Sequence, residues 1–401
     1  MKILIVSFYY PPEMGAAASR ISNMAEGLQR EGAQVEVLTC LPNYPKGRIF
    51  EGYRHRLTKH ECVNGINVFR YWTYATVSKN AFLRILGMLL FSMALWVFGL
   101  RIRRVRSYDT VIVQSPPLMV AYSAMLLFRC LYRRKTVLNI SDLWPTSAVE
   151  LGAVKTGSLY YKVLSVMERF VYRHSTAWQG QSQEIVDHVK GFGFGKPHFL
   201  YRNLQPIVPV DDSVDETRSL ADRTRLRLVY AGLLGVAQDI MGMIAHVNFK
   251  ALGAELHIYG SGNQAEAIEA YAKNNDCGVH CHGYLPKSEI DRILSSYHAS
   301  IVPLAVAIKG AVPSKIYDLL PHGTPILFCG GGEGEQIVTS YGFGLVSAPG
   351  DYEALRKNII KLRQLPDADY LLLRRQCKEA SKGVFSFDEQ MKAYYRFIDS
   401  L

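Results

Sequence analysis

Short apolar runs alternate with helical patterns in two successive series along the chain. The first series opens with an apolar run at Ile3–Val6, a helical pattern at Ala17–Arg30 and a second apolar run at Gln34–Thr39. A strand, a helix and a further strand in this order require a parallel sheet, because the helix returns the chain to the starting edge. Further strands of this half are expected at 66–71, 110–114 and 136–141. The first half is therefore predicted to be α/β.

A polar segment at 205–225 interrupts this periodicity with two prolines and mixed charges. The chain of 401 residues also exceeds the ~250–300 residues that one hydrophobic core supports. Beyond the segment, strands are expected at 227–231, 255–259, 279–282, 299–303 and 325–328, with helices between them at 240–249, 264–273, 287–297 and 314–320.

We therefore predict a first domain at 1–204, a linker at 205–225, a second domain at 226–384 and a terminal helix at 385–401. Packing back on the first domain is one option for that helix. Two doubly wound, Rossmann-like domains that face each other leave a central cleft lined by strand ends, where such folds bind ligands.

The charge balance favours anionic partners. Lys and Arg number 46 against 35 Asp and Glu, a formal net charge of +11, which suits nucleotide phosphates, polyprenyl pyrophosphates, anionic lipids or nucleic acid. The seven cysteines are scattered, which is typical of reduced thiols in a cytosolic protein. The first apolar run is too short for a signal peptide and fits a buried strand.

An uncharged stretch at 85–100 extends back to Ala81 to give 20 residues, enough at ~1.5 Å each to cross ~30 Å of hydrocarbon. A true span would place strands of one sheet on opposite sides of the membrane. We therefore expect a monotopic pair of membrane-associating helices near 81–104 and 118–132, with basic runs beside them for anionic headgroups. The alternative is an ordinary buried helix.

Glycine turns follow the first strand of each half, at Gly15 and at Gly232 and Gly235. A turn between a strand and a helix offers free N–H groups to a phosphate. Two such loops that face one cleft would hold a diphosphate between them. A tight turn without a ligand explains each loop equally well by itself.

The segment from Val312 to Leu327 carries the most chemistry. Ser314 is placed to cap a helix, Lys315 to reach a phosphate, and Asp318 to accept ribose hydroxyls from the next turn of the same face. A glycine-rich loop at 330–334 follows. The plain alternatives are a solvated charge for Lys315 and a surface ion pair for Asp318.

These motifs resemble the retaining glycosyltransferases of family four, which have the GT-B fold. The similarity lies in Ser7–Glu13, Pro42–Gly47, Ser141–Pro145, Ser147–Gly152, Tyr230–Gln238 and Pro313–Lys315. It is closest to the bacterial fucosamine (N-acetyl-L-fucosamine) transferases of O-antigen and capsule assembly.

The resemblance implies transfer of an N-acetylated deoxy sugar from a UDP-type nucleotide sugar to a polyprenyl-pyrophosphate-linked saccharide. It also implies a location at the cytoplasmic face of the bacterial inner membrane and no cofactor beyond the nucleotide sugar.

The resemblance also implies roles for single residues. Two acidic residues separated by seven positions contact the donor in that family; Asp318 matches the second, and Gly310 occupies the first. The Arg and Lys that hold the diphosphate in the family align with Leu233 and Gln238. Lys315 is then the remaining candidate for that charge.

The predicted catalytic residues are Lys315 and Asp142, the latter facing the acceptor hydroxyl. A helix cap is the alternative for Asp142. The predicted donor-binding residues are Gly15, Gly232, Gly235, Gln238, Gly260, Ser314, Lys315, Asp318, Gly331, Gly332 and Glu333. The predicted acceptor-side residues are Glu13, Asn43, Tyr44, Trp144 and Glu150.

No metal is expected. Asp367 and Asp369 sit at a predicted helix start, and strand alternation points His280 and His282 away from Cys281. A non-catalytic sugar-nucleotide or lipid-headgroup binding protein of the same fold is the rival prediction. A dinucleotide oxidoreductase is disfavoured because Gly-x-Gly-x-x-Gly is absent after the first strand. A nucleic-acid-binding protein is disfavoured because the basic clusters adjoin apolar helices.

Overall fold

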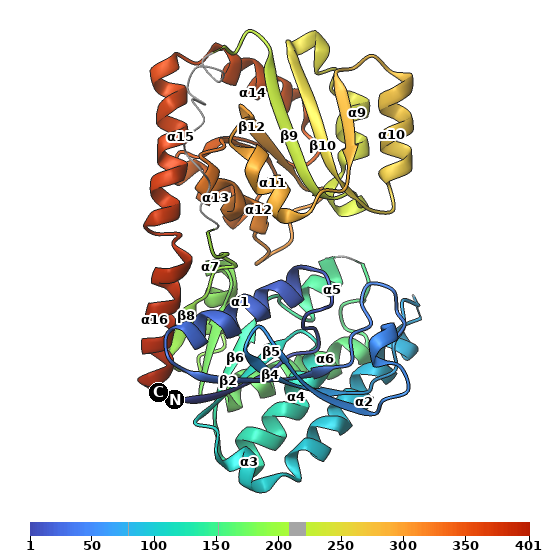
Figure 1. Ribbon diagram of the computed structural model, residues 1–401, viewed down its shortest axis with the longest axis vertical. Helices are drawn as coiled ribbons and strands as arrows, with labels where there is room; N and C mark the ends of the chain where they lie inside the picture. The colour runs from blue at the N-terminus through green and yellow to red at the C-terminus, as the bar shows by residue number, and fades with distance from the viewer. Residues whose placement is uncertain (79, 151, 208–221) are drawn as a thin grey trace. The chain divides into compact units, whose positions relative to one another are not determined.

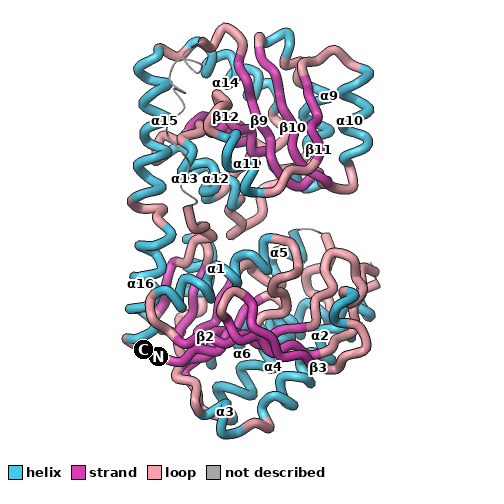
Figure 2. The backbone as a smooth tube through the Cα atoms, in the orientation of Figure 1, coloured by secondary structure: helices cyan, strands magenta, loops and turns pink. Residues whose placement is uncertain are grey.

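The computed structural model describes residues 1–78, 80–150, 152–207 and 222–401. The chain forms two compact units, residues 1–203 with 388–401, and residues 204–387. Each unit holds one sheet with helices on both faces (Figure 1, Figure 2). The prediction of two Rossmann-like α/β domains is confirmed. Most of the expected linker, 208–221, lies outside the described residues.

The sheet of the first unit has eight strands in the order β3-β4-β2-β1-β5-β6-β7-β8. They are β1 (Lys2–Val6), β2 (Gln34–Cys40), β3 (Thr58–Val63), β4 (Ile66–Tyr71), β5 (Thr110–Ser115), β6 (Lys135–Ile140), β7 (Ala177–Gly180) and β8 (His198–Leu200). Neighbours are parallel except for the β3–β4 hairpin at one edge. The apolar run of β1 is uninterrupted because this central strand is buried on both faces.

Helices cover both faces of that sheet. They are α1 (Ala16–Arg30), α2 (Ala81–Gly99), α3 (Ile102–Arg106), α4 (Leu118–Ala124) with its π-helical continuation η2 (Met125–Leu131), α5 (Thr146–Glu150), α6 (Leu159–His174), α7 (Gln183–Lys190) and α16 (Phe387–Asp399). The terminal helix α16 belongs to the first unit, where the Tyr201 and Tyr394 rings meet at 4.9 Å. Gln390 Oε1 there accepts the Arg202 N–H at 2.9 Å.

The second unit has a fully parallel sheet in the order β11-β10-β9-β12-β13-β14. Its strands are β9 (Leu226–Leu233), β10 (Ala254–Ser261), β11 (Val279–Gly283), β12 (Ala299–Pro303), β13 (Ile326–Cys329) and β14 (Gly344–Ser347). Its helices are α9 (Ile240–His246), α10 (Ala265–Asn274), α11 (Lys287–Leu294), α12 (Ser314–Leu319), α13 (Glu333–Ser340), α14 (Tyr352–Gln364) and α15 (Asp367–Lys382).

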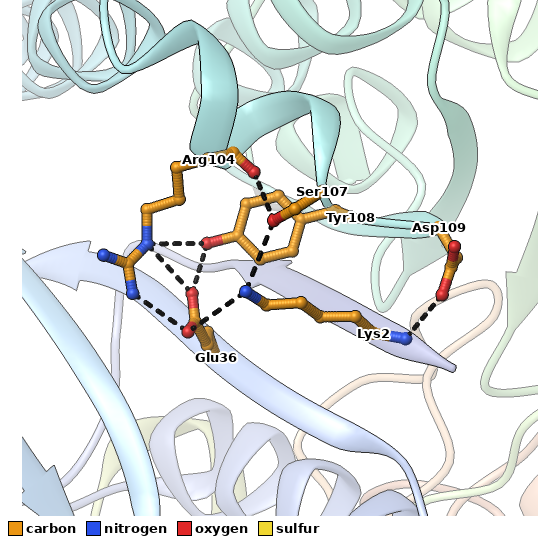
Figure 3. Close-up of polar contacts among 6 residues, drawn as sticks. All are labelled: Lys2, Glu36, Arg104, Ser107, Tyr108 and Asp109. Carbon is orange, nitrogen blue, oxygen red and sulfur yellow. Dashed lines mark hydrogen bonds and ion pairs between the residues drawn. The ribbon is translucent and has the colours of Figure 1, made fainter.

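A buried carboxylate ties the basic helix α3 to the sheet of the first unit. Glu36 of β2 accepts hydrogen bonds from Arg104 at 2.9 and 3.2 Å and from the Tyr108 hydroxyl, and Lys2 Nζ lies 3.7 Å away (Figure 3). Burial favours the neutral acid, but the hydrogen bonds from Arg104 and Tyr108 outweigh it and hold the pKa of Glu36 below its usual value. The ionised form of Glu36 therefore stabilises the fold.

We expect Glu36→Gln to reduce the free energy of unfolding by ~1–3 kcal/mol at pH 7, because the charged hydrogen bonds are lost. A depressed folded pKa gives stability that is present above the unfolded value of ~4.3 and is lost as pH falls through the folded value. The melting temperature of the wild type should therefore fall more steeply below pH 5 than that of the variant. Thermal unfolding of the full chain from pH 7 to 3 measures this.

Glu51→Gln is the matched control, since that side chain is 88% exposed beside Arg54. Equal pH slopes for wild type and Glu36→Gln would contradict the role of this carboxylate.

Candidate functional site

Two glycines let the ends of β9 and β10 approach each other in the second unit. Gly232 has φ 153° and Gly260 φ 155°, and a Cβ on Gly260 would stand 1.8 Å from the carbonyl oxygen of Gly232. The two residues are paired in the parallel ladder. Backbone packing therefore requires a glycine at position 260, and the same packing fixes the position of Gly232.

The amine of Lys315 occupies the space above Gly232. A Cβ on Gly232 would lie 1.9 Å from Lys315 Nζ, and that nitrogen is 5.2 Å from the centre of the Tyr230 ring. The Tyr230 hydroxyl donates to the carbonyl of Leu233 at 2.6 Å and so braces the turn. Burial lowers the pKa of Lys315, while Asp318 raises it. The amine makes no ion pair with any residue that the structure describes.

Asp318 lies one turn further along α12, and four fifths of its side chain is covered. Its Oδ1 is 3.9 Å from Lys287 Nζ and accepts no hydrogen bond from the described part of the chain. Burial raises the pKa of Asp318, and Lys287 and Lys315 oppose that shift. Lys287 is closer to Asp291, at 3.0 Å. Asp318 and Lys287 line one pocket with Tyr317 and residues 204–207.

The remaining predicted donor residues surround the same sheet edge. Gln238 lies beside Gly235, where a Cβ would come within 3.0 Å of its Oε1, and this buried oxygen has no partner among the described residues. Gly331 and Gly332 lead from β13 into α13, whose first residue Glu333 is buried. β13 is a near neighbour of β9, with β12 between them, so these turns share one edge of the parallel sheet.

The expected helix cap at Ser314 is wrong. Pro313 occupies the N-cap position of α12, and no side chain caps this helix. Ser314 is its first helical residue, because the proline already fixes a backbone conformation compatible with the entry to a helix.

On the first unit, Glu13 is held by the backbone. Its carboxylate accepts N–H groups from Asn43 at 2.8 Å, Tyr44 at 2.9 Å and Tyr10 at 3.2 Å. Burial raises its pKa, and these hydrogen bonds oppose the shift. The Gly15 turn adjoins the same loop, with a Cβ there 3.3 Å from the Tyr44 ring. Glu13 therefore holds the loop that follows β1 against the loop that follows β2. Tyr44 is exposed, so a ligand can contact its side chain.

Asp142 follows β6 and is associated with a cation that the sequence analysis missed. Burial raises the pKa of Asp142, and Arg20 of α1 lowers it. Arg20 is itself buried and donates to Gln181 Oε1 at 3.0 Å, while Gln181 donates to the carbonyl of Ser141. The helical spacing could have indicated this residue. Arg20 stands four residues before the buried Met24 and therefore on the face of α1 that packs on the core.

Two further acceptor-side candidates lie close to Asp142 in the chain. Trp144 is half-buried against the core of the first unit, and Glu150 ends α5. In the described structure α5 begins only at Thr146, so Asp142 does not stand at the N-cap position of that helix.

The histidines of β11 lie on one face, as the strand alternation predicts. His282 Nε2 is 2.9 Å from His257 Nδ1, and the rings of His280 and His257 are 5.1 Å apart. Within the described residues no group of three or more His, Cys, Asp or Glu side chains has the geometry to hold a metal ion.

Two family models match the chain. One, described as a glycosyl transferase 4-like domain, matches residues 15–201, and the other, glycosyl transferases group 1, matches residues 226–364. The chain is a glycosyltransferase, with a first domain of the glycosyl transferase 4-like type and a second domain of the glycosyl transferases group 1 type. This assignment agrees with the architecture described above, since the solved structures of similar fold are GT-B glycosyltransferases.

Individual relatives of this glycosyltransferase are distant. WcaI of Escherichia coli (strain K12), named for glycosyl transfer in colanic acid biosynthesis, is 23% identical over 80% of this chain and 82% of its own length. WbjE of Pseudomonas aeruginosa, named as a glycosyltransferase, is 24% identical over 65% and 68%. The structure of Anabaena Alr3699/HepE in complex with UDP matches all of both chains with TM-score 0.70 and 12% identity, which shows a shared fold.

Replacing Gly232 tests the seating of the Lys315 amine. We expect Gly232→Ala to lower the free energy of unfolding by ~1–3 kcal/mol, because alanine disfavours φ 153° and its Cβ displaces the amine. Denaturant unfolding measures the change. Gly52→Ala is the control, since a Cβ there meets nothing within 4 Å, and it should stay within ~0.5 kcal/mol of the wild type. A Gly232→Ala variant as stable as the control would contradict this geometry.

Proposed function

We propose that the protein is a retaining glycosyltransferase of bacterial surface polysaccharide biosynthesis. It moves a sugar from a UDP-type nucleotide to a polyprenyl-pyrophosphate-linked saccharide. The observation that carries the proposal is the amine of the half-buried Lys315, which lies over Gly232 at a strand end and makes no ion pair with the described residues. A partly desolvated cation that lacks an anion is placed to receive one, and the diphosphate of a nucleotide sugar supplies it.

The position of Lys315 compensates for a departure from the family pattern. Leu233 and Gln238 stand where the resemblance places the diphosphate-binding Arg and Lys. Lys315 comes from a different element, α12, yet its amine reaches Gly232, the immediate neighbour of Leu233. The positive charge at the turn after β9 therefore comes from α12 and not from a residue of the turn.

In the proposed reaction Lys315 stabilises the negative charge that develops on the departing diphosphate. Asp318 accepts the ribose hydroxyls, since its Oδ1 accepts no hydrogen bond from the described residues. The resemblance to fucosamine transferases and the name of WcaI support a polysaccharide product, and the UDP in the Alr3699/HepE structure supports a UDP-type donor. Gly310 replaces the first acidic residue of the family pair, which leaves the donor sugar to other contacts.

Asp142 serves the acceptor side of the reaction. The acceptor hydroxyl attacks on the face from which the nucleoside diphosphate leaves, and its proton passes to the departing phosphate with help from Asp142. Arg20 lowers the pKa of that half-buried carboxylate against the effect of burial and so favours its ionised form. We also propose that the enzyme works at the cytoplasmic face of the bacterial inner membrane, where lipid-linked acceptors are accessible.

A non-catalytic binding protein of the same fold is the second candidate, favoured by the loss of charge at Leu233, Gln238 and Gly310. Mass spectrometry of reactions with a panel of sugar nucleotides and a polyprenyl-pyrophosphate-linked acceptor decides between them. A glycosylated acceptor is expected; nucleotide binding without product would favour the second candidate.

Lys315→Met should lower kcat by about 10²- to 10³-fold, the effect of removing one group that stabilises transition-state charge. The variant keeps the apolar stem, so the fold should be unaffected. Lys273→Met is the control, because that lysine is exposed on α10 and pairs with Glu269. Nucleotide release at saturating donor is the measurement. Unchanged kcat in Lys315→Met would refute the role of this amine.

The pH dependence of transfer tests Asp142. Its ionised form is the active one, so kcat/KM should rise with pH through its pKa. Removal of the Arg20 charge in Arg20→Met raises that pKa further, which moves the acidic limb to higher pH. Arg20→Lys should restore most of the wild-type profile, and Asp142→Asn should lose the limb. An unshifted profile in Arg20→Met would argue for a purely structural arginine.

A further inference from the structure

Helices α2 and α6 of the first unit each carry an exposed apolar stripe. Leu89, Met93 and Val97 recur every four residues along α2, and Leu159, Val163 and Val166 follow the same helical spacing on α6. Each of these side chains is between 45% and 79% exposed. The opposite faces are fully packed, with Phe91 and Leu95 of α2 wholly buried. The apolar surface is therefore additional to what the core requires.

Helix α4 contacts both α2 and α6. The Trp96 indole of α2 donates to Ser123 of α4 at 3.1 Å, and Tyr122 of α4 packs on Phe170 of α6 at 4.6 Å. We call α2, α4 and α6 the three-helix layer; α2 and α4 lie side by side in Figure 1. Most residues of α4 and of its continuation η2 are buried. In this proposal α4 therefore supports the surface, and α6 supplies the second exposed stripe in place of the expected segment 118–132.

The charge around the layer selects the kind of partner. Residues 62–141 contain eleven Lys and Arg and one acidic residue, Asp109; two of the arginines, Arg70 and Arg104, pair with Glu61 and Glu36. Arg84, Arg101, Arg103 and Arg106, beside or within the α2–α3 segment, are all exposed. Like charges of this density repel a second copy of the same face, whereas they attract an anionic surface that is apolar beneath its headgroups.

We propose that the outer face of the three-helix layer seats the enzyme on an anionic phospholipid bilayer, with α2 lying in the interface. This inference rests on the proposed function for the choice of a bacterial membrane. By length and composition Phe82–Gly99 could cross a bilayer. However, β4 and β5, which precede and follow α2, belong to one sheet, and one side of α2 forms the core of the unit. An in-plane helix satisfies both constraints.

Sedimentation of the full chain with vesicles tests this seat. Vesicles of phosphatidylcholine with phosphatidylglycerol should bind the protein, and pure phosphatidylcholine vesicles should bind it more weakly. Met93→Glu/Val163→Glu should reduce binding about tenfold or more, since two aliphatic side chains leave the interface. Leu372→Glu, on an exposed apolar position of the second unit, is the control and should bind as the wild type does.

No binding to anionic vesicles, or equal binding by the double variant, would overturn the proposal. A dimer that the double variant abolishes, without vesicle binding, would also overturn it in favour of a second copy. Transfer to a water-soluble acceptor without vesicles is measured in parallel and should be unchanged in the double variant. If the wild type binds vesicles but transfers no sugar, that result would contradict the proposed reaction and leave the membrane proposal standing.

Discussion

Taking a lysine amine partly out of water costs free energy, and the second unit meets that cost where the half-buried Lys315 lies over Gly232. The arrangement depends on the parallel sheet: Gly232 and Gly260 allow two strand ends to come together, and the absence of a side chain at Gly232 leaves room for the amine. The Tyr230 ring gives a partial electrostatic counterpart, but a ring face is a weak substitute for an anion. The amine makes no ion pair with the described residues, and in the proposed function its partner is the diphosphate of the donor.

In the first unit the side chain concerned is an acid, and the group beside it is a cation. Asp142 is a half-buried carboxylate, and the charge of Arg20 on α1 lowers its pKa against the effect of burial. Gln181 connects the arginine to the segment that carries the aspartate. In each unit a charged side chain therefore lies beside a residue of another element: Lys315 beside Gly232 of β9, and Asp142 near Arg20 of α1.

The fold was predictable because its signals are local. Buried parallel strands give continuous apolar runs, and most expected strands of both units match the observed ones to within one or two residues. The antiparallel edge strand β3 was missed because its alternating polar residues face solvent on an edge strand. The exposed stripe of α6 was missed because periodicity alone does not tell which of two apolar faces the core will cover.

The site was predictable only in part. Lys315 and Asp318 follow from residue types at helical spacing, but the sequence could not show that the two side chains meet different partners, Gly232 and Lys287 respectively. Arg20 is 122 residues away from Asp142 in the chain, so only the folded sheet brings them together. The error at Ser314 arose because Pro313 was not recognised as the cap position.

A crystal structure of the protein with UDP would show whether Lys315 binds the diphosphate. We expect a phosphate oxygen within ~3.2 Å of Lys315 Nζ, at the turn formed by Gly232. A nucleotide bound with its phosphates away from that amine would contradict it.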